Sequence, residues 1–378
     1  MNPGVEQILA RQDPGRIVYA PNYWQWFAHQ RNHGLLPEEL RKAGSQLGMI
    51  QSLGLDVFSR NIYCDEQFAW FGALCNPVWD SPVVEDVSRS EEGQDIVWEK
   101  KYATPAGSLH ERLRYVWSAS TLEQEKFLVT DYEDQADCFD HWLRNRRFEF
   151  DPSRWNREQK QLQAGEVICA GEVISPLKLL QMTMGPEQAV FLLVDEPDLA
   201  AQWMRLHHEQ QIDAMRQMLE GGVSAIMAMD NLDSQFHPPH YVEQYSAGFY
   251  EDAASLCHQH GATFWIHACG NQRVNLELIA SLGVDGLEGV AFPPMGDVTL
   301  PEALELTGDR FLVTGGISAI EFESLKTRES VFEYVRNLFA GLKDYRHRFM
   351  FAASCNTPIN ARWEQIVWFR DAWREYGG

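Results

Sequence analysis

The sequence predicts a (β/α)8 barrel, and three observations support this fold class. Short apolar runs alternate with helical segments eight times between Arg16 and Glu375. The later runs are almost continuously apolar, as in parallel strands that are buried on both faces. The 378 residues contain no Ser/Gly-rich linker, so we expect a single domain over residues 1–378. A doubly wound open sheet is the alternative, but no Gly-rich dinucleotide loop supports it.

Each predicted strand is a short run rich in Val, Ile and Phe, which is typical of buried strands. In chain order the runs are Arg16–Pro21, Leu55–Ile62, Glu166–Val173, Val223–Asp230, Thr263–Cys269, Val284–Val290, Arg310–Thr314 and Arg348–Ala353. Apolar residues at helical spacing follow most of these runs. The clearest helical segments are Tyr241–His260, Arg273–Leu282, Val331–Leu342 and Asn360–Glu375.

The segment between the second and third strands departs from this repeat. We place an insertion at about residues 68–155, because Asp95–Trp117 consists of two extended segments around a Thr-Pro-Ala-Gly turn. A helix over Tyr132–Arg147 follows this β-hairpin. The sequence leaves open whether the insertion covers the mouth of the barrel or forms a contact in a homodimer.

The charge balance excludes several classes of partner. Lys and Arg total 32 against 54 Asp and Glu, which gives a net charge of −22. Nucleic acids and anionic membrane surfaces require basic patches, so we expect neither as a partner. The sequence contains no run of 18 apolar residues, so we expect no membrane span, and no secretory leader is visible. With seven cysteines, an odd number, we expect reduced thiols and a cytoplasmic location.

The strongest chemical signal is the end of the fifth predicted strand. Residues i and i+2 of a strand point to the same side, so His267 and Cys269 converge, and an imidazole with a thiolate is a typical zinc pair. Cys355 follows the eighth strand and would lie on the same rim, because all strand ends of a barrel meet there. Three protein ligands leave a fourth position open, as in catalytic zinc sites. The alternative is that these are ordinary buried core residues.

Glu288 ends the sixth predicted strand on the same rim. Two roles are open for its carboxylate. It either fills the fourth zinc position when no substrate is bound, or it contacts the substrate as a catalytic group.

Four features together resemble the uroporphyrinogen decarboxylase superfamily. They are the His-x-Cys-Gly strand end (His267–Gly270), the Gly-Val-Asp-Gly-Leu-Glu segment (Gly283–Glu288), the run Pro293–Asp297, and Cys355 shortly before Thr-Pro. The closer branch resembles the corrinoid-related methylcobamide:coenzyme M methyltransferases. The resemblance covers most of the chain from about Arg16 and is strongest from Val223 onward. It implies a (β/α)8 barrel and a zinc ion held at positions that match His267, Cys269 and Cys355.

The resemblance implies an enzyme that moves a methyl group between a small substrate and a cobalamin or other corrinoid. A thiol, a methoxylated or N-methylated compound and tetrahydrofolate all remain open as substrates. No Asp-x-His-x-x-Gly corrinoid motif is visible, so the corrinoid would be free or carried by a partner protein. A metal-free decarboxylase is the alternative activity, but the N-terminal Arg-rich signature of that branch is missing. A non-catalytic binding protein with structural zinc is a third interpretation.

Residues after the fourth predicted strand are further candidates for the barrel mouth. Asp230, Asn231 and Asp233 would form hydrogen bonds with the substrate or transfer a proton to it. The alternative is that an aspartate of this set caps a turn or the next helix. His237, beside Pro238-Pro239, either lines the pocket or belongs to a rigid surface loop.

The first predicted strand leads into an aromatic, almost uncharged segment. Asn22, Tyr23 and Trp24 are therefore candidate substrate-binding residues, because such a wall suits a small or methylated substrate. Packing of these aromatic side chains in the core is the alternative.

Overall fold

The computed structural model describes residues 4–60, 62 and 73–378. In this part of the chain, seven parallel strands form one sheet in the order β1-β15-β14-β13-β12-β11-β10. Their bounds are β1 (Val18–Tyr19), β10 (Ala170–Val173), β11 (Ala225–Ala228), β12 (Thr263–His267), β13 (Gly286–Val290), β14 (Leu312–Ile317) and β15 (Phe349–Ala353). The predicted α/β fold with a parallel sheet is confirmed.

The second and third predicted runs pair with each other. Strand β2 (Phe58–Ser59) runs parallel to β9 (Val167–Ile168), and only Cys169 separates β9 from β10. Near the start of the second run, the Asp56 N–H donates to the carbonyl of Tyr19, the last residue of β1, at 2.9 Å. Each of the eight predicted runs therefore contains a strand, although Asn61 of the second run lies outside the described residues.

Alternate strand residues belong to two separate hydrophobic clusters, which explains the almost continuous apolar runs. In β12, Phe264 and Ile266 pack with the surrounding helices, whereas Trp265 packs with Phe58 and Met350. A side chain on Gly286 would overlap the Trp265 ring, with a Cβ only 2.4 Å from it. Both faces of the sheet are therefore buried.

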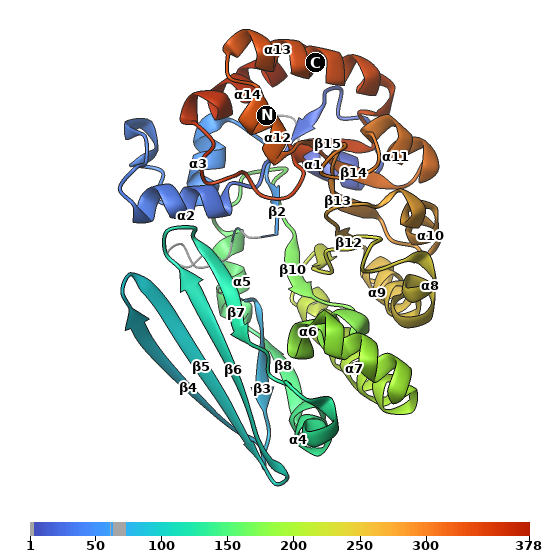
Figure 1. Cartoon of the computed structure of the whole chain (residues 1–378). Helices are drawn as coiled ribbons and strands as arrows, with labels where there is room; N and C mark the ends of the chain where they lie inside the picture. The colour runs from blue at the N-terminus through green and yellow to red at the C-terminus, as the bar shows by residue number, and fades with distance from the viewer. Residues whose placement is uncertain (1–3, 61, 63–72) are drawn as a thin grey trace.

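Helices surround the parallel strands (Figure 1). Many follow a strand, as the repeat predicts, and the four predicted helical segments are all present. The bounds are α1 (Gly4–Leu9), α2 (Trp24–Asn32), η1 (Glu38–Leu40), α3 (Gln46–Leu53), α6 (Pro176–Asp195), α7 (Pro197–Glu220), α8 (Pro239–Tyr241), η2 (Val242–Ser246), α9 (Ala247–Gln259), η3 (Arg273–Asn275), α10 (Leu276–Ser281), α11 (Leu300–Leu306), α12 (Ala319–Ser324), α13 (Arg328–Leu342), η4 (Lys343–Tyr345) and α14 (Trp363–Tyr376).

A separate antiparallel sheet lies between β2 and β9 in the chain. It contains β4 (Val84–Glu92), β5 (Asp95–Thr104), β6 (Gly107–Val116) and β7 (Thr121–Lys126). Strands β5 and β6 are the hairpin predicted at Asp95–Trp117, whereas β4 and β7 are additional. Nearby elements are β3 (Cys75–Trp79), which pairs with β8 (Arg146–Phe150), and the helices α4 (Tyr132–Arg144) and α5 (Pro152–Gln159). The predicted start of the insertion, Phe68, lies outside the described residues.

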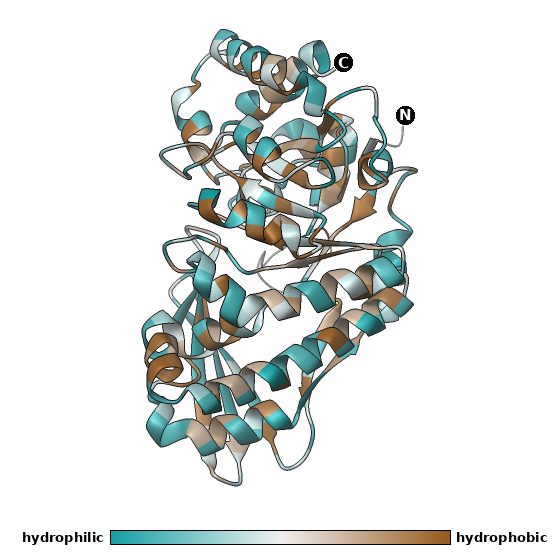
Figure 2. Cartoon of the chain, turned by 90° about the vertical axis from the view of Figure 1, so that its right-hand side faces the viewer, coloured by the Kyte–Doolittle hydropathy of each residue, from teal (hydrophilic) through white to brown (hydrophobic). Residues whose placement is uncertain are grey.

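The antiparallel sheet lies to one side of the parallel strands (Figure 1). Tyr102 and Leu109 of its hairpin share a hydrophobic cluster with α4, α6 and α7, through residues such as Phe139, Leu180 and Trp203. Figure 2 shows the helices of this side with mixed hydrophilic and hydrophobic residues. None of the helices in the described part of the chain combines the length and apolar character that crossing a bilayer requires.

Candidate metal centre

Two strand ends bring the three predicted metal ligands together. His267 is the last residue of β12 and Cys269 follows two positions later, while Cys355 lies two positions after β15. The His267 Nε2 atom is 3.1 Å from the Cys269 sulfur and 3.8 Å from the Cys355 sulfur. All three ligand atoms lie within 4.8 Å of one another. Residues that are far apart in sequence thus form one cluster.

Gly289, between the two ligand segments, allows their backbones to approach. Its φ of +111° is a conformation that favours glycine. A Cβ at this position would lie 2.1 Å from the Ala268 carbonyl oxygen and 2.6 Å from that of Ser354. These two residues immediately precede Cys269 and Cys355. The sequence analysis did not single out Gly289, although its position directly after Glu288 in a predicted strand is a detectable signal.

Glu288 supports the histidine from the side opposite the thiols. Its Oε2 accepts hydrogen bonds from His267 Nδ1 at 2.5 Å and from Arg60 Nε at 2.8 Å. Burial alone would raise the pKa of Glu288, but the charges of Arg60 and His267 lower it to about 2. Glu288 is therefore an ionised carboxylate that fixes the ring so that Nε2 faces the sulfurs. This position differs from the predicted fourth ligand or substrate contact, because the carboxylate is held between Nδ1 and the guanidinium.

Arg60 contacts a neighbour of each ligand segment, Glu288 beside His267 and Asn356 beside Cys355. Its side chain is buried directly after β2, and besides Glu288 it contacts the Asn356 side-chain oxygen at 3.5 Å. The Trp24 indole N–H also donates to that oxygen, and Asn356 follows Cys355. The sequence analysis missed Arg60 and Asn356, because only the tertiary fold shows their partners.

The two thiols are electrostatically unequal. A hydrogen bond from Cys269 lowers the pKa of Cys355 well below its ordinary value, and His267 acts in the same direction. The same bond and burial raise the pKa of Cys269. Without a metal, the pair therefore favours a thiolate at Cys355 that accepts a hydrogen bond from Cys269. Such a thiolate is the form that binds a soft metal.

A cavity of about 770 Å³ opens beside the three ligands. Among the predicted residues, Trp24, Asn231, Asp233 and His237 line it together with the three ligands. Apolar side chains form much of the remaining wall, including Met182, Pro186, Met229 and Phe236. The cavity is large enough for a small organic substrate.

Asp230, which we predicted to be catalytic, lies outside this cavity lining. Its side chain is fully buried and accepts hydrogen bonds from the Ser175 N–H and the Tyr250 hydroxyl. Ser175 is the N-cap of α6. The carboxylate therefore connects the end of β11 to α6 and α9. In this position Asp230 does not line the cavity, in contrast to the predicted contact with substrate.

Asn22 and Tyr23 also lie away from the cavity lining. The Tyr23 hydroxyl contacts the Tyr19 hydroxyl at 3.1 Å, and the ring belongs to the main hydrophobic cluster. The Asn22 amide contacts Asn356 at 3.4 Å. The alternative of core packing is thus correct for Tyr23, while Trp24 alone of the three reaches the cavity.

A family model described as uroporphyrinogen decarboxylase (URO-D) matches residues 157–376. The chain belongs to the uroporphyrinogen decarboxylase family. The matched region contains the three candidate ligands and Glu288, whereas Arg60 and Trp24 precede it. The resemblance to this superfamily in the sequence analysis is therefore confirmed.

The fold of this URO-D family member is also similar to a solved structure, a methyltransferase from Methanosarcina mazei. The TM-score is 0.59 at 12% sequence identity, and the similarity covers 98% of this chain and 97% of the other. At this identity the likeness concerns the fold. No curated protein matches the sequence.

The donor set fits a zinc ion. Tetrahedral zinc with bonds of about 2.0–2.3 Å places neighbouring ligand atoms about 3.5–3.8 Å apart. The two nitrogen–sulfur separations in the structure, 3.1 and 3.8 Å, are close to this spacing. Two thiolate sulfurs and one imidazole nitrogen are typical ligands of zinc. Magnesium and calcium instead prefer oxygen ligands.

Proposed function

We propose that this chain is a zinc-dependent methyltransferase or demethylase component that moves a methyl group between a small substrate and a corrinoid carrier. The observation that carries the proposal is the cluster of His267, Cys269 and Cys355 at the wall of a substrate-sized cavity. Three soft protein ligands beside open space are typical of catalytic zinc. The likeness in fold to a methyltransferase supports the same class of reaction.

Zinc bound by these residues would lower the pKa of a substrate thiol or hydroxyl, or withdraw electrons from a methylated donor. Glu288 and Arg60 keep the His267 ring in one orientation. With zinc bound, Cys269 and Cys355 would both be thiolates and would supply two negative charges to the site. Trp24, Met229 and Phe236 contribute apolar side chains to the wall of the cavity.

The proposed thiol reaction is balanced as a methyl-cation transfer. Zinc held by His267, Cys269 and Cys355 would keep the substrate sulfur as a thiolate, and this thiolate would form the new sulfur–carbon bond with the methyl group of a methylcobalamin co-substrate. The electron pair of the broken cobalt–carbon bond would leave with the corrinoid, so that the substrate becomes a thioether. We propose that the corrinoid is free or bound to a partner protein, since the sequence has no Asp-x-His-x-x-Gly motif.

We further infer that the eight strand segments close into a barrel. The support is the hydrogen bond between Asp56 and Tyr19, which joins the β2 segment to β1, together with the pairing of β2 with β9.

The family name suggests decarboxylation of a porphyrinogen as the second candidate. Among the described lining residues the arginine and lysine side chains are Arg60 and Lys178, and Arg60 is paired with Glu288. A macrocycle with eight carboxylates would need more cationic partners than this. The decarboxylase proposal also gives no role to the clustered imidazole and thiols.

The test is methyl transfer from methylcobalamin to a small thiol, followed by the visible absorbance of the corrinoid. We expect the zinc-loaded protein to be active and Cys269→Ala to lose both zinc and activity. Cys257→Ala is the matched control, because that buried thiol lies in α9 outside the cluster. Full activity of Cys269→Ala would contradict the mechanism, and metal-independent conversion of a porphyrinogen would favour the decarboxylase.

A further inference from the structure

Strand β4 forms one edge of the antiparallel sheet. In the described part of the chain it pairs only with β5, and Figure 1 shows it as the outermost strand of its sheet. All nine of its residues are exposed, and they include two apolar side chains, Val84 at 63% and Val87 at 49% exposure. An edge strand of this length offers a row of N–H and carbonyl groups to another strand.

The turn between β4 and β5 determines which residues of β4 direct their backbone groups outwards. Its two-residue loop, Gly93-Gln94, joins Glu92 to Asp95, which lie opposite each other in the ladder. Gly93 has a φ of +69°, a conformation typical of glycine in such tight turns. The pair that flanks a two-residue turn exchanges both of its hydrogen bonds, and the pattern then alternates along the strand. The backbone groups that point to the open edge are therefore those of Glu85, Val87, Arg89 and Glu91.

The sequence of β4 is complementary to itself in one antiparallel register. When Val87 of two copies lies at a two-fold axis, Glu85 of each copy lies opposite Arg89 of the other. The two valines then form an apolar pair at the centre. Opposite charges that face each other across an antiparallel pair stabilise it, as do paired β-branched side chains.

Neighbouring registers place like charges opposite each other. An axis at Asp86 or at Arg89 pairs that residue with its own copy, and an axis at Ser88 places Glu85 opposite Glu91. Like charges in directly opposite positions are destabilising. The charge pattern therefore selects the register with Val87 at the axis, and a second copy of this chain is the partner that it fits.

Contacts with β5 already position the two charged side chains of this register. The Tyr102 hydroxyl donates to Glu85 Oε1 at 3.1 Å, and the Arg89 guanidinium lies 5.9 Å from the centre of the Trp98 ring. Both contacts lie on the same face of the sheet, because Glu85 and Arg89 are four residues apart in one strand. Side chains that are ordered in advance lose less entropy when a second copy binds.

We propose that this chain forms a two-fold homodimer in which the β4 edges of two copies pair antiparallel, with Val87 at the axis. The two antiparallel sheets would then become one continuous sheet through both copies. Of the two roles that the sequence leaves open for the insertion, this is the contact in a homodimer. The contact involves neither the candidate metal ligands nor the cavity beside them, so it does not depend on the proposed function.

The first test is sedimentation velocity of the full chain at increasing concentrations and physiological salt. The salt screens the repulsion between two chains that each carry a net charge of −22. We expect a reversible dimer that becomes populated as the concentration rises, because an edge contact of this kind is small. Glu85→Arg should raise the dissociation constant at least about tenfold, since it places Arg opposite Arg89 at two symmetric positions.

A charge exchange separates pairing across the axis from damage to the sheet. Arg89→Glu alone should weaken the dimer as Glu85→Arg does, and the double variant Glu85→Arg/Arg89→Glu should dimerise again. Glu91→Arg is the matched control, because it makes the same change of charge on the same strand. In the proposed register Glu91 lies opposite Val83, so this control should leave the dissociation constant almost unchanged.

Cysteine cross-linking tests the register itself. Hydrogen-bonded pairs of an antiparallel sheet have Cα atoms about 5.5 Å apart, which is within the range of a disulfide. Val87→Cys should therefore form a covalent dimer in an oxidising glutathione buffer. Ser88→Cys should not, because the two copies of residue 88 would be diagonal neighbours about 7–8 Å apart. The native chain controls for its own thiols.

A native chain that stays monomeric at every concentration would overturn the proposal. A dimer that Glu85→Arg leaves unchanged, or that the double variant fails to restore, would contradict the charge pairing and overturn it too. Cross-linking of Ser88→Cys in place of Val87→Cys would exclude the register. Zinc content and methyl transfer are measured separately, so each of these results would leave the proposed methyltransferase function standing.

Discussion

Glu288 illustrates how a carboxylate beside a candidate metal site can orient a histidine of that site. It accepts from His267 Nδ1 and from Arg60, which leaves Nε2 directed at the sulfurs. The sequence placed Glu288 on the correct strand, but Glu288 is the middle residue of β13 and not its end. The sequence also could not show which ring nitrogen the carboxylate contacts. That distinction depends on the separation of β12 and β13 and on Arg60, a partner 228 residues away in the chain.

We expect Glu288→Gln to weaken zinc binding by about 10- to 100-fold, the usual effect of removing such a supporting carboxylate. The amide keeps the shape but removes the charge that orients His267 and balances Arg60. Competition with a coloured zinc chelator measures the affinity. Glu302→Gln is the control, because Glu302 pairs with Arg273 on the surface. Unchanged affinity in Glu288→Gln would show that the carboxylate has no role in the metal centre.

Gly289 gives a second prediction at the residue scale. Gly289→Ala should lose zinc and lower the melting temperature, because its Cβ would overlap the backbone oxygens of Ala268 and Ser354. Gly283→Ala is a matched control. Its φ is +80°, but the nearest atom to its Cβ is the Ala254 methyl at 3.6 Å.

Zinc titration and thermal unfolding of both variants separate two effects. Both variants place a side chain at a positive φ, whereas only the Cβ of Gly289→Ala overlaps neighbouring backbone oxygens. The control should retain zinc even if its positive φ lowers stability. Normal zinc binding by Gly289→Ala would mean that the two ligand segments do not require this close approach.

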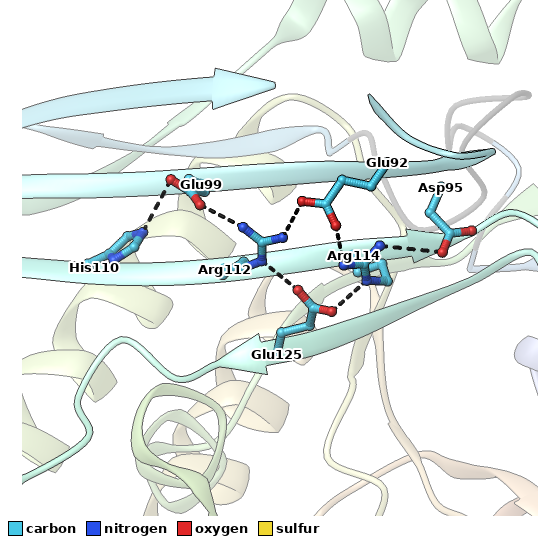
Figure 3. Close-up of polar contacts among 7 residues, drawn as sticks. All are labelled: Glu92, Asp95, Glu99, His110, Arg112, Arg114 and Glu125. Atoms are coloured by element: carbon cyan, nitrogen blue, oxygen red, sulfur yellow. Dashed lines mark hydrogen bonds and ion pairs between the residues drawn. The ribbon is translucent and has the colours of Figure 1, made fainter. Parts of the chain in front are cut away.

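At the scale of elements, the antiparallel sheet carries a network of ion pairs on one face (Figure 3). Arg112 of β6 pairs with Glu92 of β4, Glu99 of β5 and Glu125 of β7, at 2.6–2.7 Å. Arg114 shares Glu92 and Glu125 with it. On this face, ion pairs between side chains thus connect all four strands of the sheet.

Arg112→Met should lower the midpoint of urea unfolding at low salt, and the loss should shrink at high salt because screening weakens ion pairs near the surface. Lys101→Met on the neighbouring strand is the control, since Lys101 has no ion pair within the described residues. Equal effects of the two substitutions at low salt would contradict a stabilising role for the network.

The network also explains which strands the sequence could predict. Apolar runs in the sequence predict buried strands such as β12, and the turn between its two strands predicts the β5–β6 hairpin. Strand β4 is exposed along its whole length and rich in acidic residues, so no hydrophobic pattern marks it. Its pairing with β5 is visible only in the folded chain.

At the scale of the whole molecule, the parallel sheet determines which distant residues meet. The carboxyl ends of β12 and β15 lie on the same edge, and this brings Cys355 to the His-x-Cys pair. That much could be predicted from strand order alone. The position of Asp230 could not, because its hydrogen-bond partners come from α6 and α9, and a strand-end aspartate looks the same in both roles.

The most direct measurement of the central claim is the metal content of the purified protein, by elemental mass spectrometry, beside Cys355→Ala and the Cys257→Ala control. We predict about one zinc per chain in the native protein and in Cys257→Ala, and far less in Cys355→Ala. Absence of zinc from carefully prepared native protein, or full zinc content in Cys355→Ala, would contradict the metal centre on which the proposed methyl transfer depends.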